Sequence, residues 1–177
     1  MADYESKRAQ MYSYLDELNA IQGDSTVHGE RYAQWFDGLV ESVYDGYTDW
    51  ITLQDKQGQY AGELLIGKRP NCHPDADFYI EEAFTVKNAR RKGIMTAAVT
   101  EYVKSHPGIY CYFVLTKNHA AAQFWDKVFI SLGYEPIELR DVGAGDPDVV
   151  QCGYKKHNVD QLDQIAHDSI ASLHKTT

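Results

Sequence analysis

The sequence predicts one α/β domain with a mixed β-sheet and helices on both faces of the sheet. Hydrophobic residues recur with helical spacing near both ends of the 177-residue chain and with strand-like spacing between them. A strand, a helix and a strand follow one another between residues 78 and 116, an order that requires a parallel crossover. The apolar run at 109–116 is typical of a strand covered on both faces. Helices above and below the sheet follow from this pattern.

The first half of the chain begins with two amphipathic helices, predicted at 3–21 and 29–44. In the first helix the apolar stripe is Met11, Tyr14, Leu15, Leu18 and Ile21. The period then changes to that of strands at 49–55 and 60–68, which a tight turn joins. A loop at 69–77 precedes a third strand.

The second half alternates helices and strands. The predicted elements, with the third strand, are strand 78–86, helix 90–105, strand 109–116, helix 118–133, an antiparallel strand pair at 134–142 and 148–156, and helix 159–174. We treat residues 1–177 as a single domain, in which 1–28 form an N-terminal helix and loop and 159–177 a C-terminal helix.

Composition and charge exclude several classes of protein. Hydrophobic residues make up 44% of the chain, which indicates a folded domain rather than a disordered one. No apolar run is long enough to span a membrane, and the N-terminus lacks a signal-peptide pattern. The three widely spaced cysteines, Cys72, Cys111 and Cys152, favour reduced thiols and a cytoplasmic location. The net charge of −9 argues against a nucleic acid as the main partner.

A basic turn precedes the helix predicted at 90–105. Arg90, Arg91 and Lys92 run directly into Gly93. The N-terminus of a helix exposes unpaired N–H groups and the positive end of the helix dipole, and flanking cations add charged hydrogen bonds to phosphate oxygens. Cations at this end of a helix do not stabilise its dipole, so an anion site is a better explanation than ordinary surface charge. Neither the P-loop nor the Rossmann glycine pattern is present.

Two blocks of sequence resemble the GNAT superfamily of N-acetyltransferases. The stretch IEEAFTVKNARRKG, from Ile80 to Gly93, resembles the strand and R-x-x-G turn of the family's acetyl-CoA motif. The second block, from Asn118 through Ala121 and Phe124 to SLGYEP, resembles the family's N-x-x-A-x-x-F-Y segment. The resemblance implies a mostly antiparallel sheet in which one parallel strand pair is splayed, with extra helices at both termini.

The resemblance also implies a cofactor site and a reaction. Acetyl-CoA is expected as co-substrate, with no metal, and acetyl transfer to a primary amine is expected by direct attack in a ternary complex. Dimers are frequent in the family, so a homodimer is possible. The expected cofactor-binding residues are Phe84, Thr85 and Val86 beside the pantetheine arm, Arg91, Lys92, Gly93, Ile94, Met95 and Thr96 around the pyrophosphate, and Asn118 and Trp125 on the opposite side.

The chain departs from the family pattern at several positions. Met95 replaces a small residue, and Trp125 stands where the family usually has a tyrosine general acid. Phe129, one turn further on, cannot supply a proton either. The usual first strand is not visible, because the chain opens with a helix. A CoA-binding module with little or no catalytic activity is therefore the alternative to an enzyme. A nucleic-acid adaptor that uses the basic turn is a more remote one.

Acetyl transfer to an alkyl amine needs a base. An amine with a pKa near 10.4 is mostly protonated at pH 7, and its deprotonation costs about 4.6 kcal/mol. The candidate bases are Glu82 and then Glu81, which are adjacent on a strand and should point to opposite faces unless a bulge intervenes. Either could instead be a solvated surface group.

The acceptor side has weaker signals. The segment 30–50 is rich in acidic and aromatic residues, a composition that suits a cationic small-molecule or peptide amine. The same residues also fit a core stripe with a solvated acidic face. In the 69–77 loop, Cys72, His73, Asp75 and Asp77 match no common zinc spacing, and we interpret them as loop residues.

Overall fold

The computed structural model describes residues 2–22, 30–69, 73–140 and 149–156. The helix predicted at 159–174, the loop between the first two helices and Cys72 lie outside these ranges. The helices are α1 (Ala2–Gln22), α2 (Glu30–Tyr44), α3 (Ile94–Ser105) and α4 (His119–Ser131), with a 3-10 turn, η1 (Lys87–Ala89). The strands are β1 (Thr48–Gln54), β2 (Tyr60–Lys68), β3 (Phe78–Thr85), β4 (Tyr110–Leu115), β5 (Tyr134–Ile137) and β6 (Val149–Lys156).

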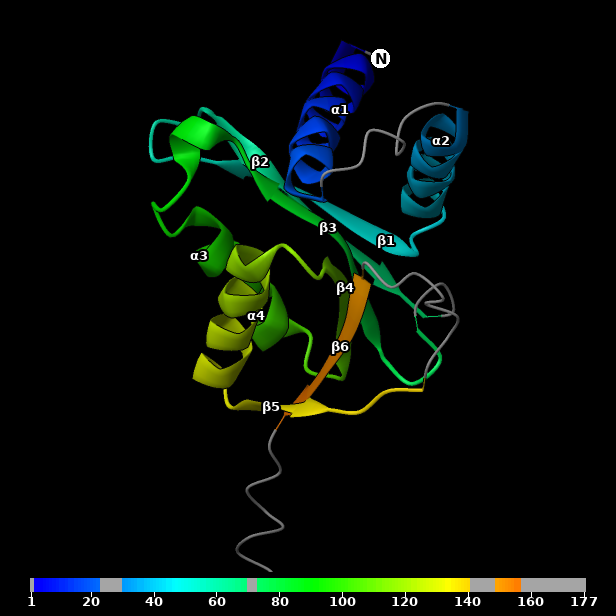
Figure 1. The fold of residues 1–177 in the computed structure, drawn as a ribbon. Coiled ribbons are helices and arrows are strands. Elements are labelled where there is room, and N and C mark those ends of the chain that lie inside the picture. The colour runs from blue at the N-terminus through cyan, green and yellow to red at the C-terminus, as the bar shows by residue number, and fades with distance from the viewer. Residues whose placement is uncertain (1, 23–29, 70–72, 141–148, 157–177) are drawn as a thin grey trace, which may run out of the picture.

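The strands form one six-stranded sheet in the order β1-β2-β3-β4-β6-β5. Every neighbouring pair is antiparallel except β3 and β4, which are parallel. These two strands pair only from Phe78 opposite Tyr110 to Ile80 opposite Tyr112. β3 then continues to Thr85 and β4 to Leu115 without pairing to each other. The predicted splayed parallel pair is therefore confirmed, and the sheet opens between the carboxyl ends of these strands (Figure 1).

A β-bulge lies on β3, close to the point where the parallel strands separate. Leu65 of β2 pairs with Glu82, whereas the next residue, Ile66, pairs with Ile80. Glu81 is thus an extra residue with no partner position on β2. A bulge of this kind breaks the alternation of side chains along a strand.

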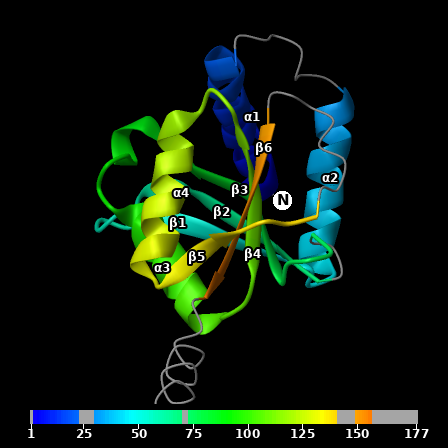
Figure 2. The ribbon, with the colours of Figure 1, turned by 60° about the horizontal axis from the view of Figure 1, so that its bottom comes forward.

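Helices cover both faces of the sheet, with α1 and α2 on one face and α3 and α4 on the other (Figures 1 and 2). β2 is buried along almost its whole length because it lies between these two layers. Its alternate residues enter different cores: Leu65 packs with Met11 and Leu15 of α1, whereas Leu64 and Ile66 belong to the larger core under α3 and α4.

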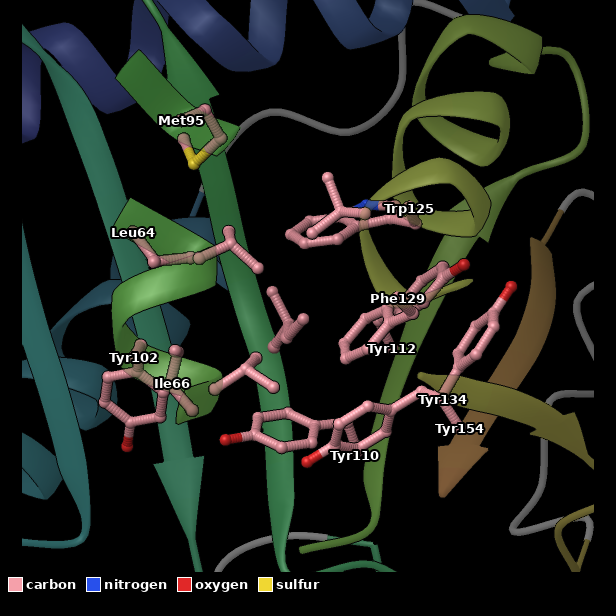
Figure 3. Close-up of a cluster of buried hydrophobic side chains, with 14 of the residues drawn as sticks. Leu64, Ile66, Met95, Tyr102, Tyr110, Tyr112, Trp125, Phe129, Tyr134 and Tyr154 are labelled. Carbon is pink, nitrogen blue, oxygen red and sulfur yellow. The ribbon is translucent and has the colours of Figure 1, made fainter. Parts of the chain in front are cut away.

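The larger core is rich in aromatic rings. Phe129 is fully buried there and stacks on Tyr154, with ring centroids 4.7 Å apart. Trp125 projects from α4 toward the middle of this cluster (Figure 3), and its ring centroid lies 5.2 Å from that of Tyr112. The core therefore holds α4 against β4 and β6 and fixes the position of Trp125.

Two predicted boundaries were wrong. The helix expected at 90–105 begins only at Ile94, because Arg91 and Gly93 have positive φ angles of 61° and 77° that are incompatible with a right-handed helix. The strand expected at 134–142 ends at Ile137. Of the helices in the described ranges, none has the length and apolar character needed to cross a bilayer.

Candidate active site

Two adjoining cavities occupy the opening between β3 and β4. The basic-turn cavity, of about 460 Å³, is lined by residues of the turn before α3, and the glutamate cavity, of about 230 Å³, is lined by Glu81 and Glu82. Residues of α1, β3 and α4 line both cavities: Tyr14, Leu18, Ala83, Asn118, Ala121 and Trp125. The two cavities therefore adjoin each other at these residues and together make up the candidate cleft.

The turn before α3 presents a row of unbonded amides. Among the backbone hydrogen bonds of the described residues, none is donated by an amide of residues 91–96. Gly93 is the N-cap of α3 with φ 77° and ψ 4°, and no side chain caps this end of the helix. Arg91, with its own positive φ, and Gly93 both line the basic-turn cavity. Amides in such a turn, at the positive end of a helix dipole, form an anion-binding concavity.

The three cations of the turn have different surroundings. Arg91 lines the basic-turn cavity, and so does Arg90. However, the Nη2 atom of Arg90 lies 2.6 Å from Oε2 of Glu17, and its Nε donates to the Thr85 carbonyl at 2.8 Å. Arg90 thus ties α1 to the end of β3. Lys92 lies in a separate hollow of about 610 Å³ between β1 and α3.

The remaining cofactor candidates are divided between the cavity and the core. Ile94, Met95 and Thr96 line the basic-turn cavity together with Phe84 and Thr85. Val86 is the exception, because it packs against both hydrophobic cores and lines neither cavity.

The opposite side of the cleft is the N-terminal half of α4. Asn118 is the N-cap, and its Oδ1 accepts the amide of Ala121 at 3.2 Å. This cap leaves the side-chain NH₂ group of Asn118 as a donor. Trp125 is only 6% exposed, although it lines both cavities. Its indole ring forms an apolar wall and offers no acidic proton.

The bulge on β3 brings both glutamates to the same cavity. Regular alternation would have sent Glu81 and Glu82 to opposite faces, whereas both line the glutamate cavity and both are partly buried. Burial raises the pKa of Glu81 to about 7. Burial also raises the pKa of Glu82 to about 8, with a hydrogen bond from Tyr14 lowering it and the charge of Glu81 raising it further. Such carboxylates are much stronger bases than free glutamate near neutral pH.

Tyr14 of α1 lines both cavities and is a candidate site residue that the sequence did not reveal. Its ring stacks on Phe84 with centroids 5.0 Å apart and 17° between the planes, and its hydroxyl donates a hydrogen bond to the Glu82 carboxylate. In the sequence Tyr14 is one of five members of an apolar stripe, and only its hydroxyl distinguished it from a core residue.

Segment 30–50, considered above for acceptor binding, does not contribute to the cleft through the residues whose side chains are described. Between Asp37 and Trp50, no side chain lines either cavity: Tyr44 is 87% exposed, and Trp50 donates to Oε2 of Glu63 at 2.8 Å. Of the described aromatic residues of segment 30–50, Trp50 packs against the core as the core-stripe interpretation requires, whereas Tyr44 and Tyr47 are exposed.

In the 69–77 loop, Nε2 of His73 lies 2.9 Å from the Arg140 carbonyl, and Nδ1 accepts the amide of Asp75 at 3.0 Å. Both ring nitrogens of His73 are thus engaged in holding the loop, as the loop interpretation requires. Within the described part of the chain, no cluster of side chains suited to a metal ion is found.

Comparison with known proteins gives a match of fold. No protein-family model and no curated protein matches the sequence. The structure is similar to an acetyltransferase of the GNAT family from Staphylococcus aureus, with a TM-score of 0.53 and 12% identity over 79% of this chain and 85% of that one. It is also similar to a histone acetyltransferase HPA2 and related acetyltransferase from Corynebacterium glutamicum, with a TM-score of 0.51 and 15% identity over 70% and 73% of the two chains. The chain therefore has the GNAT N-acetyltransferase fold.

Proposed function

We propose that this protein is an acetyl-CoA-dependent N-acetyltransferase that acts on a primary amine of a small molecule or peptide. The observation that carries the proposal is the cleft made up of the two adjoining cavities at the ends of β3 and β4. At one end it has a basic turn with unbonded amides, and at the other end it has two carboxyl groups with raised pKa values. An acyltransferase needs these two ends, one for the anionic donor and one for deprotonating the acceptor. The GNAT fold supports the same assignment.

The residues of the basic-turn cavity fit acetyl-CoA. A diphosphate carries charge and several acceptor oxygens, which match the amides of residues 91–96 and the guanidinium of Arg91. The pantetheine arm has amides of its own, and β3 beyond Ile80 is not paired with β4. We assign the arm to this strand beside Phe84, where one carbonyl, that of Thr85, already accepts from Arg90. Asn118 is assigned to the cofactor from the opposite side of the cleft.

We assign Glu82 as the general base and Glu81 as a second carboxylate that tunes it and attracts a cationic amine. Deprotonating an alkyl amine at pH 7 costs about 4.6 kcal/mol, and a base whose pKa lies near the working pH is the most effective acceptor of that proton. Glu82 has a pKa of about 8, so it meets this condition. The neutral amine then attacks the thioester directly, with no covalent enzyme intermediate.

The test combines binding with turnover. Titration calorimetry with acetyl-CoA is expected to show saturable binding, and the ligand at 100 times its Kd should stabilise the fold by about 2.7 kcal/mol. Thiol release is then measured over polyamines, aminoglycosides, amino acids and peptide N-termini. Absence of both acetyl-CoA binding and thiol release would refute the proposal.

A second candidate function is a CoA-binding module without turnover. The observation that favours it is Trp125, which occupies the position where the resembling family usually has a tyrosine acid. Acetyl-CoA binding together with no thiol release from any amine of the panel would support this second function.

A further inference from the structure

Tyr14 lies where the two cavities meet. Tyr14 is one of the six residues that line both of them. Among those six, it alone carries a hydroxyl group: the others are Leu18, Ala83, Asn118, Ala121 and Trp125. The thioester of a donor in the basic-turn cavity has to reach the acceptor at this junction. Tyr14 is therefore the phenol that the fold places between donor and base.

Contacts from three directions hold Tyr14 in place. Its ring stacks on Phe84 of β3, and its hydroxyl is hydrogen-bonded to Glu82 of the same strand. On α1 itself, Met11 and Leu15 are buried in the core beside it. One turn further on, Glu17 pairs with Arg90, which fixes the helix to the loop after β3. These contacts keep the ring of Tyr14 in one position. A proton donor has to be positioned in this way to act on a reacting atom.

We propose that Tyr14 is a catalytic residue that gives its phenolic proton to the departing thiolate and recovers a proton from the Glu82 carboxyl group. This inference rests on the proposed acetyltransferase function and adds a residue to it. It also answers the lack of an acidic proton on Trp125, because the donor comes from the N-terminal helix instead of from α4.

The proton balance closes over one turnover. Glu82 first takes the extra proton of the amine, passes it to solvent and is ionised again, and the nitrogen then attacks the thioester carbonyl carbon as a neutral group. Glu82 takes the proton that this nitrogen sheds as the C–N bond forms. When the C–S bond breaks, sulfur receives the proton of Tyr14, and the proton on Glu82 moves to the phenolic oxygen along their hydrogen bond. The products are an amide and a free thiol, and both residues return to their starting states.

The electrostatic surroundings require the two proton movements to be coupled. Burial, and then the charge and hydrogen bond of Glu82, raise the pKa of Tyr14 well above its ordinary value. The charge of Arg90 lowers this pKa, and that of Glu17 raises it. The phenol therefore keeps its proton throughout the working pH range. A lone phenolate beside ionised Glu82 and Glu81 would be strongly disfavoured. Proton donation becomes feasible only once Glu82 carries the proton that replaces it.

The test uses Tyr14→Phe in the full chain, because phenylalanine keeps the ring that stacks on Phe84. We expect kcat at the optimal pH to fall at least 100-fold, the usual size of a general-acid effect, with the Kd for acetyl-CoA within about threefold of wild type. The matched control is Tyr12→Phe, which removes another hydroxyl from α1 at a residue that lines neither cavity. It should leave kcat within about threefold. The double variant with Glu82→Gln should be no slower than the slower single variant.

A spectroscopic measurement separates proton donation from simple positioning. Carbon-13 NMR of labelled glutamates should show a higher pKa for Glu82 in Tyr14→Phe, since the hydrogen bond from Tyr14 lowers it. The proposal would be overturned if Tyr14→Phe raised the pKa of Glu82 but kept kcat at the optimal pH within threefold of wild type. Tyr14 would then only adjust the pKa of the base. A higher pKa for Glu82 together with the loss of kcat would support proton donation by Tyr14. A wild-type protein that releases no thiol from any amine would instead refute the proposed function and this inference with it.

Discussion

Replacing Glu82 with glutamine tests whether the pKa of Glu82 is raised, and the test needs no substrate. Burial raises the pKa of Glu82 from 4.5 to about 8, and each pKa unit corresponds to 1.36 kcal/mol. Keeping this carboxylate ionised in the folded protein therefore costs on the order of 5 kcal/mol, and the partial exposure of the side chain reduces that figure. Glutamine is neutral at every pH and so avoids this cost.

The sign of the effect follows from proton linkage. Between about pH 4.5 and pH 8 the folded protein holds a proton on Glu82 that the unfolded chain has released. The free energy of unfolding of the wild type should therefore fall as the pH rises through this window. Glu81, with a pKa raised to about 7, adds a fall in the same direction. The Glu82→Gln protein should lose the part of this dependence that Glu82 contributes.

Urea unfolding, followed by fluorescence between pH 5 and pH 9, measures this difference. We expect the difference in the free energy of unfolding between Glu82→Gln and wild type to change with pH. At pH 8–9 this difference should favour the variant by several kcal/mol more than at pH 5. The control is Glu41→Gln, which removes an exposed carboxylate of α2 and should follow the wild-type curve. Parallel curves for wild type and Glu82→Gln would show that Glu82 is an ordinary solvated carboxylate and would remove it as the base. In turnover assays, kcat/KM of the wild type should rise with pH up to about 8, and the variant should lack this limb.

Three further outcomes follow from the surroundings of individual side chains. Arg91→Glu should raise the Kd for CoA by about 10- to 100-fold in calorimetry, because a charged hydrogen bond is lost and a repulsion is added. Lys92 lies in a separate hollow, so Lys92→Glu should raise the Kd less. Equal increases would contradict the assignment of Arg91 to the CoA diphosphate. Glu17→Gln breaks a partly exposed ion pair with Arg90. Thermal unfolding should show that the free energy of unfolding falls by less than about 1 kcal/mol, as is usual for exposed ion pairs. A larger fall would mean that this pair holds α1 more strongly than an exposed ion pair normally does. Phe129→Ala should cost about 3–5 kcal/mol in urea unfolding, and a cost below 1 kcal/mol would contradict its place in the core.

The order of elements could be predicted from the sequence because each element carries its own periodic signal. The apolar run at 109–116 indicated a strand covered on both faces, and in β4 the consecutive residues Tyr110, Cys111 and Tyr112, whose side chains alternate between the faces, are all buried. The parallel crossover followed from chain order alone. The start of α3 was placed four residues too early, because Arg91 has a positive φ angle that its residue type does not suggest. A glycine marks such a conformation in a sequence, whereas an arginine does not.

Part of the candidate site depends on contacts between distant segments and could not be predicted. Arg90 and Arg91 are adjacent in the sequence, yet one binds α1 through Glu17 and the other lines the cavity. Tyr14 and Glu82 are 68 residues apart, and their contact depends on how α1 packs across β3. Helical periodicity correctly assigned Tyr14 to the buried stripe, but it could not say which strand residue the hydroxyl would meet.

Both ends of the candidate site arise where regular structure is interrupted. Regular strand alternation would have placed only one glutamate in the cavity, and the extra residue at Glu81 brings in the second. A regular helix starting at Arg90 would have engaged several of the amides of residues 91–96 in its own hydrogen bonds, whereas the positive φ angles of Arg91 and Gly93 delay the helix and leave these amides unbonded. A left-handed arginine costs on the order of 1–2 kcal/mol, and strain of this kind persists where the surrounding structure enforces it, often at functional sites. The left-handed turn and the bulge are thus the local features that convert an ordinary α/β sheet into a cleft with a cationic end and a basic end.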